Sequence, residues 1–222
     1  MSQQVLVIAP HPDDEVLGCG GAIARHADRG DDVHVLVVTR GDPQLYPQDD
    51  EAAIRREIDA AHGVLGVATT TQLDFPAPRL DTIPGYQLAD AIAAILRRLQ
   101  PQTVYLPHAG DIHLDHQRVF QAALVAARPI NRCSVRQLLC YETLSETEWS
   151  PPRGDQVFIP NVFVDIAPFL ERKLKAMACY EAELQAFPHP RSLQALTALA
   201  ELRGATVGLT AAEAFALVRQ VT

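Results

Sequence analysis

A dense group of acidic and imidazole side chains lies near the start of the chain. His11, Asp13, Asp14 and Glu15 directly follow the apolar run Val5-Leu6-Val7-Ile8 and the short linker after it. A short apolar run rich in valine and isoleucine predicts a buried strand. The group is then expected at the carboxyl end of this strand, where open α/β sheets bind their ligands. Carboxylates packed so closely repel one another unless a cation or water lies between them.

A second group of the same kind occurs later in the chain. Asp111-Ile112-His113-Leu114-Asp115-His116 follows the apolar run Thr103-Val104-Tyr105-Leu106-Pro107. Each group therefore combines histidine with aspartate just after a predicted strand. Two such groups indicate a metal-dependent hydrolase.

The spacing within both groups suits a metal site. His11 and Asp14 are three residues apart, as are His113 and His116, and this spacing places two side chains on one side of a helical turn. Catalytic zinc usually takes three nitrogen or oxygen ligands from the protein and keeps one position for water. Two histidines and one carboxylate meet this requirement, although spacing alone does not decide which histidine of the second pair binds. A carboxylate beside the metal would accept a proton from the bound water, and a protonated histidine would stabilise an oxyanion.

The elements that must position these groups alternate along the chain. Strands are predicted at 5–8, 33–39, 71–75, 103–106, 137–141 and 161–166, and helices at 16–29, 51–65, 87–99, 116–127, 168–184, 192–202 and 210–221. Asp49 or Asp50 is expected to cap the second helix. The alternation predicts an α/β fold, a doubly wound, mostly parallel sheet with helices on both faces. The strand order 3-2-1-4-5 would place the two strands that precede the His/Asp groups side by side.

Composition limits the function classes. The formal net charge of -8 argues against nucleic acid or an anionic membrane as a partner, because both bind through excess lysine and arginine. No apolar run approaches the roughly 20 residues of a membrane span, and the first residues lack the features of a signal peptide. Cys19, Cys133, Cys140 and Cys179 show no CxxC spacing, which predicts reduced thiols and a cytoplasmic location. Residues 1–222 contain no repeat or linker and are expected to form one domain.

Longer motifs identify a family resemblance. Pro10-His11-Pro12-Asp13-Asp14-Glu15, paired with His113-Leu114-Asp115-His116, resembles the PIG-L/LmbE-like de-N-acetylases. These are zinc enzymes with a Rossmann-like fold that remove acetyl groups from N-acetylglucosamine-type amino sugars. Further similarities are Leu17-Gly18-Cys19-Gly20-Gly21, Arg55-Arg56-Glu57, Asn161-Val162-Phe163-Val164-Asp165-Ile166, His189-Pro190-Arg191-Ser192 and Ala212-Glu213-Ala214-Phe215.

The resemblance implies a role for most of the polar residues. The zinc ligands would be His11, Asp14 and His116, with other divalent ions able to substitute. Asp13 would be the general base. His113 would be the electrophilic partner, oriented by Asp115, which would raise the pKa of His113 by favouring the imidazolium. Residues considered for contact with a small amino-sugar substrate are Glu15, Arg55, Arg56, Asp111, His189 and Arg191.

Asp111 departs from the family pattern. Some members of the family have a tyrosine two residues before the first histidine of the second motif, where it assists the oxyanion. Asp111 at this position would bind substrate or support His113 instead.

Other interpretations are kept beside the leading one. The chain could be a metal amidase for another small N-acyl substrate, or a non-catalytic sugar- or nucleotide-binding module with a structural cation. Asp13 favours an enzyme, because a structural site needs no spare base and fills all its ligand positions. Gly18-Cys19-Gly20-Gly21 begins too far after the first strand for a dinucleotide fingerprint, so close packing of the helix is expected. Arg55 and Arg56 could equally form a solvated helix face, and the sequence leaves self-association into a homo-oligomer open.

Overall fold

A computed structural model describes residues 2–48, 50–130 and 133–222. Within these ranges one sheet has the strand order β3-β2-β1-β4-β5-β7-β6. The strands are β1 (Gln4–Ala9), β2 (Asp32–Gly41), β3 (Thr69–Ala77), β4 (Thr103–Pro107), β5 (Gln137–Tyr141), β6 (Val162–Asp165) and β7 (Ala212–Gln220). The first five run parallel, and β7 is antiparallel to both β5 and β6. The predicted doubly wound, mostly parallel sheet is confirmed.

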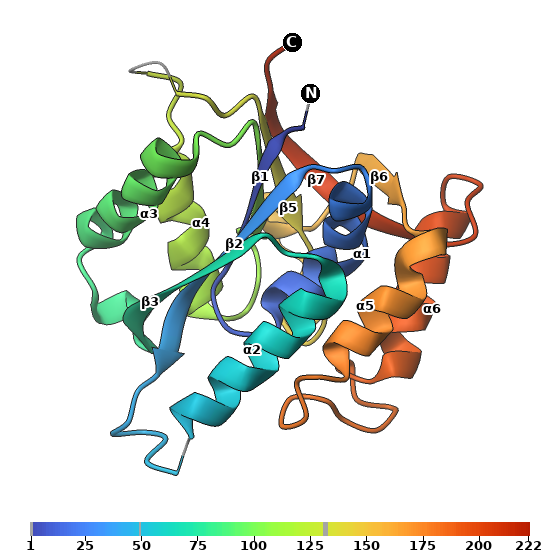
Figure 1. Ribbon diagram of the computed structural model, residues 1–222, viewed down its shortest axis with the longest axis horizontal. Coiled ribbons are helices and arrows are strands. Elements are labelled where there is room, and N and C mark those ends of the chain that lie inside the picture. The colour runs from blue at the N-terminus through green and yellow to red at the C-terminus, as the bar shows by residue number, and fades with distance from the viewer. Residues whose placement is uncertain (1, 49, 131–132) are drawn as a thin grey trace.

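Helices cover both faces of the sheet (Figure 1). They are α1 (Asp14–Asp28), α2 (Glu51–Leu65), α3 (Gly85–Leu99), α4 (Leu114–Ala126), α5 (Leu170–Met177) and α6 (Leu193–Ala205). Successive residues of β1 point to opposite faces. Val5 and Val7 belong to the core shared with α1, α2 and α5, whereas Leu6 and Ile8 belong to the core shared with α3 and α4. The sheet is therefore buried on both sides around β1.

The turn after β1 is fixed by its neighbours in the sheet. Thr39 at the end of β2 donates from its backbone nitrogen and its hydroxyl to the Pro10 carbonyl, over 3.1 and 2.8 Å. Tyr141 at the end of β5 donates its hydroxyl to the Ile8 carbonyl over 2.9 Å. Because β1 also pairs with β4, the segments that follow these two strands start from one edge of the sheet.

Two predicted helices differ from the structure. The segment predicted as a helix at 210–221 is the strand β7, because it pairs with β5 on one side and β6 on the other. Its alanines favour a helix in isolation, but sheet pairing and burial override such weak propensities. The helix predicted at 168–184 is shortened to α5, preceded by a 3₁₀ turn at Ala167–Phe169. After Met177 the chain turns, and the Tyr180 hydroxyl reaches the buried Glu15.

The remaining element predictions agree with the structure within a few residues. The Asp50 side chain caps α2 by accepting from the Ala52 nitrogen, whereas Asp49 lies outside the described residues. All four cysteines are free thiols. Among the helices of the described ranges, none is both long and apolar enough to cross a membrane.

Candidate active site

Three side chains converge at the carboxyl edge of β1 and β4. His11, Asp14 and His116 each offer one ligand atom, and these atoms lie within 4.8 Å of one another. Asp14 Oδ2 lies 3.3 Å from His11 Nδ1 and 3.3 Å from His116 Nε2. A tetrahedral zinc with bonds of about 2.0 Å spaces its ligand atoms by about 3.3 Å. Both distances from Asp14 Oδ2 therefore match the spacing that a metal of this kind requires.

Unsatisfied atoms support the same conclusion. Among the residues that the structure describes, His116 Nε2 and Asp14 Oδ1 are buried and have no hydrogen-bond partner. Leaving a buried polar atom without a partner costs on the order of 1–3 kcal/mol, and a divalent cation would satisfy both atoms. The residues present thus fit a metal centre.

A second set of side chains also meets the distance criterion, but its atoms are already engaged. His11, His113 and Asp115 offer ligand atoms within 4.8 Å of one another. However, both oxygens of Asp115 accept hydrogen bonds, from Leu80 N and from His11, and His113 Nδ1 accepts the Asp115 N–H. The set with Asp14 and His116 is therefore the better metal site.

Each histidine of the centre has a carboxylate behind it. His116 Nδ1 lies 2.8 Å from Asp111 Oδ2, and His11 Nε2 lies 3.0 Å from Asp115 Oδ2. These contacts leave the opposite nitrogen of each ring directed at Asp14. Carboxylates in this position fix the tautomer and the orientation of metal-binding histidines. Thr147, which the sequence analysis did not single out, donates to Asp111 Oδ1 over 2.6 Å.

Charges in the centre oppose the effect of burial. Burial alone would lower the pKa of His116, but Asp14 and Asp111 raise it well above its usual value. The pKa of His11 is also raised, by Asp115 and Asp14 against the effect of burial. Burial disfavours ionisation of Asp14, but His116 and His11 hold its pKa well below the usual range. In the metal-free protein Asp14 thus favours the protonated form of both rings, and both rings favour the ionised form of Asp14.

His113 differs from the sequence-based expectation. Burial first, and then the charges of His11 and His116, lower its pKa to about 4. The Asp115 carboxylate does not orient this ring, since it lies on His11; instead the Asp115 backbone N–H donates to His113 Nδ1 over 3.1 Å. The prediction of an imidazolium stabilised by Asp115 is therefore corrected. With Nδ1 accepting, the proton of the neutral ring lies on Nε2.

Asp13 begins α1 in a backbone conformation that is unusual for a residue with a side chain. Its φ is +99°, a region that L-residues rarely adopt outside turns and functional sites. Its carbonyl accepts from Val16 N and Leu17 N, which starts the helix. Burial raises the pKa of the Asp13 carboxyl well above its usual value, although Arg191 works against this shift. A cation in the adjacent centre would favour the ionised form.

Glu15 is fully buried and its carboxylate is engaged on both sides. Oε2 accepts the Asp13 N–H over 3.2 Å, and Oε1 accepts the Tyr180 hydroxyl over 2.6 Å. His62 Nε2 lies 3.2 Å from the same Oε1. These contacts leave Glu15 no face for a substrate, contrary to the prediction. Tyr180 and His62 were not predicted as site residues. Tyr180 lies in the loop after α5 and His62 lies in α2, both far from Glu15 in sequence.

Arg191 brings the C-terminal half of the chain to the site. Its guanidinium lies 3.3 Å from Asp13 Oδ2 and also contacts Glu183 and Glu146. Nε donates to Ser145 Oγ over 2.9 Å. The motif around Arg191 therefore reaches the centre through a loop whose fold could not be inferred from spacing.

The other residues considered for substrate contact lie in different places. Asp111 is fully buried behind His116, so it does not face a substrate. His189 Nδ1 accepts the Arg191 N–H, and its ring lies edge-on to Trp149. Arg55 and Arg56 are exposed on α2, where they pair with Asp59 and Asp50. The structure therefore does not bring these two arginines together with the His/Asp centre.

Comparison with known proteins decides the family. The family model described as PIG-L: GlcNAc-PI de-N-acetylase matches residues 6–127, which include both His/Asp groups. The chain belongs to the PIG-L family. The resemblance drawn from the two motifs is thereby confirmed, and α5, α6 and β7 lie outside the part matched by the family model.

Individual PIG-L relatives extend the similarity beyond this part. The chain is 33% identical over 172 residues to the uncharacterized deacetylase YaiS of Escherichia coli, covering 73% of this chain and 81% of the relative. It is 30% identical over 196 residues to the diacetylchitobiose deacetylase of Thermococcus kodakarensis, covering 82% of this chain and 70% of the relative. Among solved structures, the conserved protein TT1542 from Thermus thermophilus superposes with a TM-score of 0.79 at 27% identity. That superposition covers 99% of this chain and 96% of TT1542.

Proposed function

We propose that this PIG-L protein is a zinc-dependent hydrolase that removes the N-acetyl group from an N-acetylglucosamine-type amino sugar or its conjugate. One observation carries the proposal. Asp13 lies beside a complete two-histidine, one-carboxylate ligand set without belonging to it. A structural cation would need no such spare carboxylate. The relatives named as deacetylases, one of them acting on diacetylchitobiose, support an amino-sugar acetamide as the substrate class.

His11, Asp14 and His116 would hold the zinc. Bound zinc would supply Lewis acidity, which polarises the acetamide carbonyl and makes water a nucleophile at neutral pH. Asp111 and Asp115 would act as positioning residues, because they bond the rings of His116 and His11 and not the substrate. Other divalent ions would bind the same nitrogen and oxygen set with different affinity.

Asp13 would be the general base. It would take a proton from the attacking water and pass it to the amide nitrogen, so that the C–N bond breaks to give acetate and a free amine. Arg191 contacts Oδ2 of this carboxylate, which would hold the side chain in one orientation. Glu15 would position the same residue from behind, since it accepts the N–H of the strained Asp13 backbone.

His113 would act as a neutral hydrogen-bond donor. Its Nδ1 is occupied by the Asp115 N–H, so Nε2 would carry the proton and donate a hydrogen bond to the oxyanion that develops at the acetamide oxygen. A neutral donor fits the pKa of about 4 that burial and the neighbouring histidines impose on this ring. The general acid for the leaving nitrogen would then be Asp13 and not His113.

A panel of N-acetylglucosaminides tests the activity. The purified protein should release acetate and an equal amount of free amine from at least one member, and a chelator should abolish the release until zinc is restored. The panel should include the free sugar, diacetylchitobiose and conjugates with inositol, malate, a lipid and an antibiotic aglycone. Release from simple N-acyl amines, but from no sugar of the panel, would favour the general amidase instead. Zinc binding without any turnover would favour a non-catalytic module.

Two broader parts of the proposal concern the whole chain. Residues 1–222 would act as a single de-N-acetylase domain, because Arg191 from the C-terminal half contacts Asp13 from the first turn of α1. Location in the cytoplasm stays a prediction from cysteine usage.

A further inference from the structure

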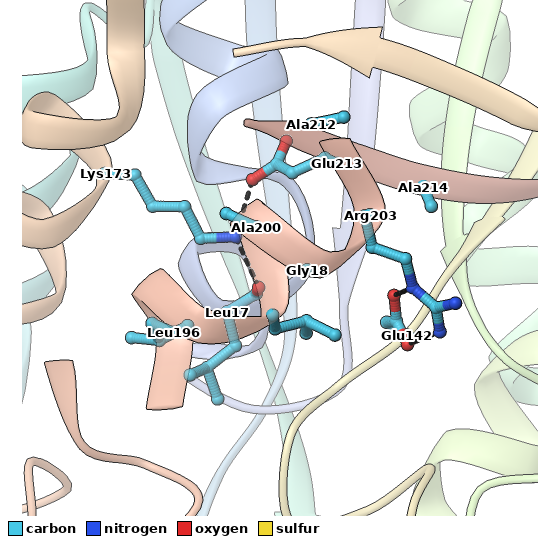
Figure 2. Close-up of a pocket in the computed structure, with 11 residues that line it drawn as sticks. Leu17, Gly18, Glu142, Lys173, Leu196, Ala200, Arg203, Ala212, Glu213 and Ala214 are labelled. Atoms are coloured by element: carbon cyan, nitrogen blue, oxygen red, sulfur yellow. Dashed lines mark hydrogen bonds and ion pairs between the residues drawn. The ribbon is translucent and has the colours of Figure 1, made fainter. Parts of the chain in front are cut away.

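A buried ion pair lies against the middle of α1, outside the proposed metal-ligand set. Lys173 of α5 and Glu213 of β7 are only 3% and 5% exposed, and Lys173 Nζ lies 2.6 Å from Glu213 Oε1. Both line a small pocket between α1, α6 and β7 (Figure 2). Neither residue takes part in the chemistry proposed above. A buried ion pair is weak evidence for stability, because desolvation offsets most of the attraction.

The pair makes its other contacts with the backbone of α1. Glu213 accepts hydrogen bonds from Gly21 N and Ala22 N over 2.8 and 2.7 Å. Lys173 donates to the Leu17 carbonyl over 2.8 Å. In a regular α-helix the Gly21 N–H would donate to that same carbonyl. The two side chains therefore enter the hydrogen-bond ladder in the middle of the helix, a place where inserted groups bend helices.

The glycines of the Leu17–Gly21 motif make room for this arrangement. A Cβ at Gly20 would lie 2.9 Å from Lys173 Cγ, and a Cβ at Gly21 would lie 2.6 Å from Ile166 Cγ2. The sequence predicted that these glycines allow close packing of the helix, and the structure shows that Lys173 and Ile166 are the side chains packed there. The glycine motif in α1 and the Glu213 motif in β7 thus contribute to the same set of contacts around Lys173.

A single turn of helix separates the Lys173–Glu213 pair from Asp13, the candidate base. Leu17, whose carbonyl Lys173 holds, donates its own N–H to the Asp13 carbonyl over 2.9 Å. Asp13 and Asp14 lie in that same first turn. A contact that restrains the backbone of Leu17 therefore also restrains the direction in which the turn presents Asp13 and Asp14 to the metal centre.

We propose that Lys173 and Glu213 are positioning residues for the metal centre, which set the geometry of the first turn of α1 by pairing within its backbone ladder. The proposal rests on the metal centre proposed above. It assigns a role to the C-terminal part of the chain. Through Lys173 and Glu213, α5 and β7 would support the α1 backbone without contacting substrate or metal. Removal of the pair should then weaken the metal centre more than it weakens the fold.

The test replaces the pair with uncharged side chains of similar shape, as Lys173→Met/Glu213→Gln. The metal-free variant should retain the circular dichroism spectrum of the wild type. Zinc affinity, measured by competition with a chromogenic chelator, should fall on the order of tenfold or more, as for other groups that orient metal ligands. Amide exchange of Val16 and Leu17 in the metal-free protein should accelerate on the order of tenfold, because their opening becomes easier.

The same pocket offers a matched control. Arg203 and Glu142 form a bidentate ion pair over 2.7 and 2.6 Å on its other side (Figure 2). Among the described residues, no hydrogen bond joins their side chains to the α1 backbone. Arg203→Met/Glu142→Gln should leave zinc affinity and the exchange of Val16 and Leu17 within about twofold of the wild type.

Several outcomes would overturn the proposal. Unchanged zinc affinity and unchanged amide exchange of Val16 and Leu17 in the Lys173/Glu213 variant would mean that the pair only holds α5 and β7 against α1. Equal losses in the control variant would mean the same. If the double variant does not fold, Glu213→Asp replaces it in the test, because this change keeps the charge but withdraws the carboxylate from α1. Wild-type zinc affinity and wild-type amide exchange in the Glu213→Asp protein would refute the proposal. A wild-type protein that binds no zinc would count against the proposed function, whereas the exchange measurements would still decide the role of the pair.

Discussion

The two histidines of the candidate metal centre are held in the same way by different residues. Asp111 follows β4 and lies on His116, while Asp115 at the start of α4 lies on His11. In both rings this leaves the nitrogen opposite the carboxylate free to face Asp14. Residue types and spacing predicted two histidines and one carboxylate, and the family resemblance selected His116 of the second pair, but neither predicted the pairing of Asp115 with His11. It depends on side-chain directions across two strands that sequence spacing does not reveal.

Removal of one supporting carboxylate should weaken metal binding without removing a ligand. We expect Asp111→Asn to lower zinc affinity by about 10–100-fold, since such partners fix ring orientation and raise ligand basicity. Chelator competition at constant pH measures the change. Asp31→Asn is the matched control, because Asp31 holds His26 in a similar carboxylate–imidazole contact of 2.7 Å outside the centre. An Asp111→Asn protein with wild-type affinity would remove Asp111 from the positioning residues.

A change at Asp13 should separate the base from the ligands. Asp13→Asn keeps the shape of the side chain but cannot accept a proton at neutral pH. We expect full zinc content and a turnover lowered by about 10²–10⁴-fold, the usual contribution of a general base. Elemental analysis and an acetate assay on the same preparation give both quantities. Loss of zinc from this variant would instead make Asp13 a ligand.

Zinc affinity should depend on pH in a direction that the site determines. The pKa values of His11 and His116 are raised above 6.5 by their carboxylate neighbours, so both rings retain protons to higher pH than free histidine. Zinc binds the neutral ring, and protons compete with it. Affinity should therefore rise with pH through and above 6.5, by up to about tenfold per pH unit for each proton displaced. Competition titrations at several pH values test this, and an affinity that is constant above pH 6 would contradict it.

At the scale of elements, the sequence was most informative where periodicity is local. The helix at 51–65 and the strand at 137–141 have the predicted bounds. An amphipathic stripe predicts a helix and a short apolar run predicts a strand without any knowledge of distant contacts. The strand β7 was mistaken for a helix, since its stability comes from pairing with β5 and β6. The loop after α5 could not be predicted either. Its course is set by the contacts of Tyr180 and Arg191 with the site.

That loop gives an element-scale prediction. Tyr180→Phe removes only the hydroxyl that donates to Glu15 Oε1. We expect the free energy of unfolding to fall by about 1.5–3 kcal/mol, the range for hydrogen bonds to charged groups. If Glu15 positions Asp13, kcat should fall while KM and zinc content stay unchanged. Denaturant unfolding and steady-state kinetics provide these values. A raised KM with unchanged kcat would show that the loop contacts substrate and does not support the base.

At the scale of the whole molecule, the active site joins parts that are remote in sequence. Residues after β1 and β4 are the proposed metal ligands and the proposed base. Thr147, after β5, contacts Asp111 beside His116, and Arg191, after α5, contacts Asp13. Parallel strand order explains the first convergence, because neighbouring strands of a doubly wound sheet open their carboxyl ends into one crevice. The second convergence requires the packing of α5 and β7 against α1, which sequence patterns did not indicate.

Because the proposed ligands follow both β1 and β4, bound zinc should stabilise the entire fold. A ligand that binds only the folded state adds about 4 kcal/mol when its free concentration is 1,000 times Kd. For a chain of this size each kcal/mol shifts Tm by about 2–4 °C, so saturating zinc should raise Tm by roughly 8–16 °C. His116→Ala removes the proposed ligand that follows β4 and should lose most of this shift. Its metal-free Tm should lie below that of the metal-free wild type, because the buried Asp14 and Asp111 lose the imidazole that they contact. Calorimetry with and without zinc measures both proteins. An equal rise in the variant would mean that zinc binds elsewhere and that these two strands do not share a metal.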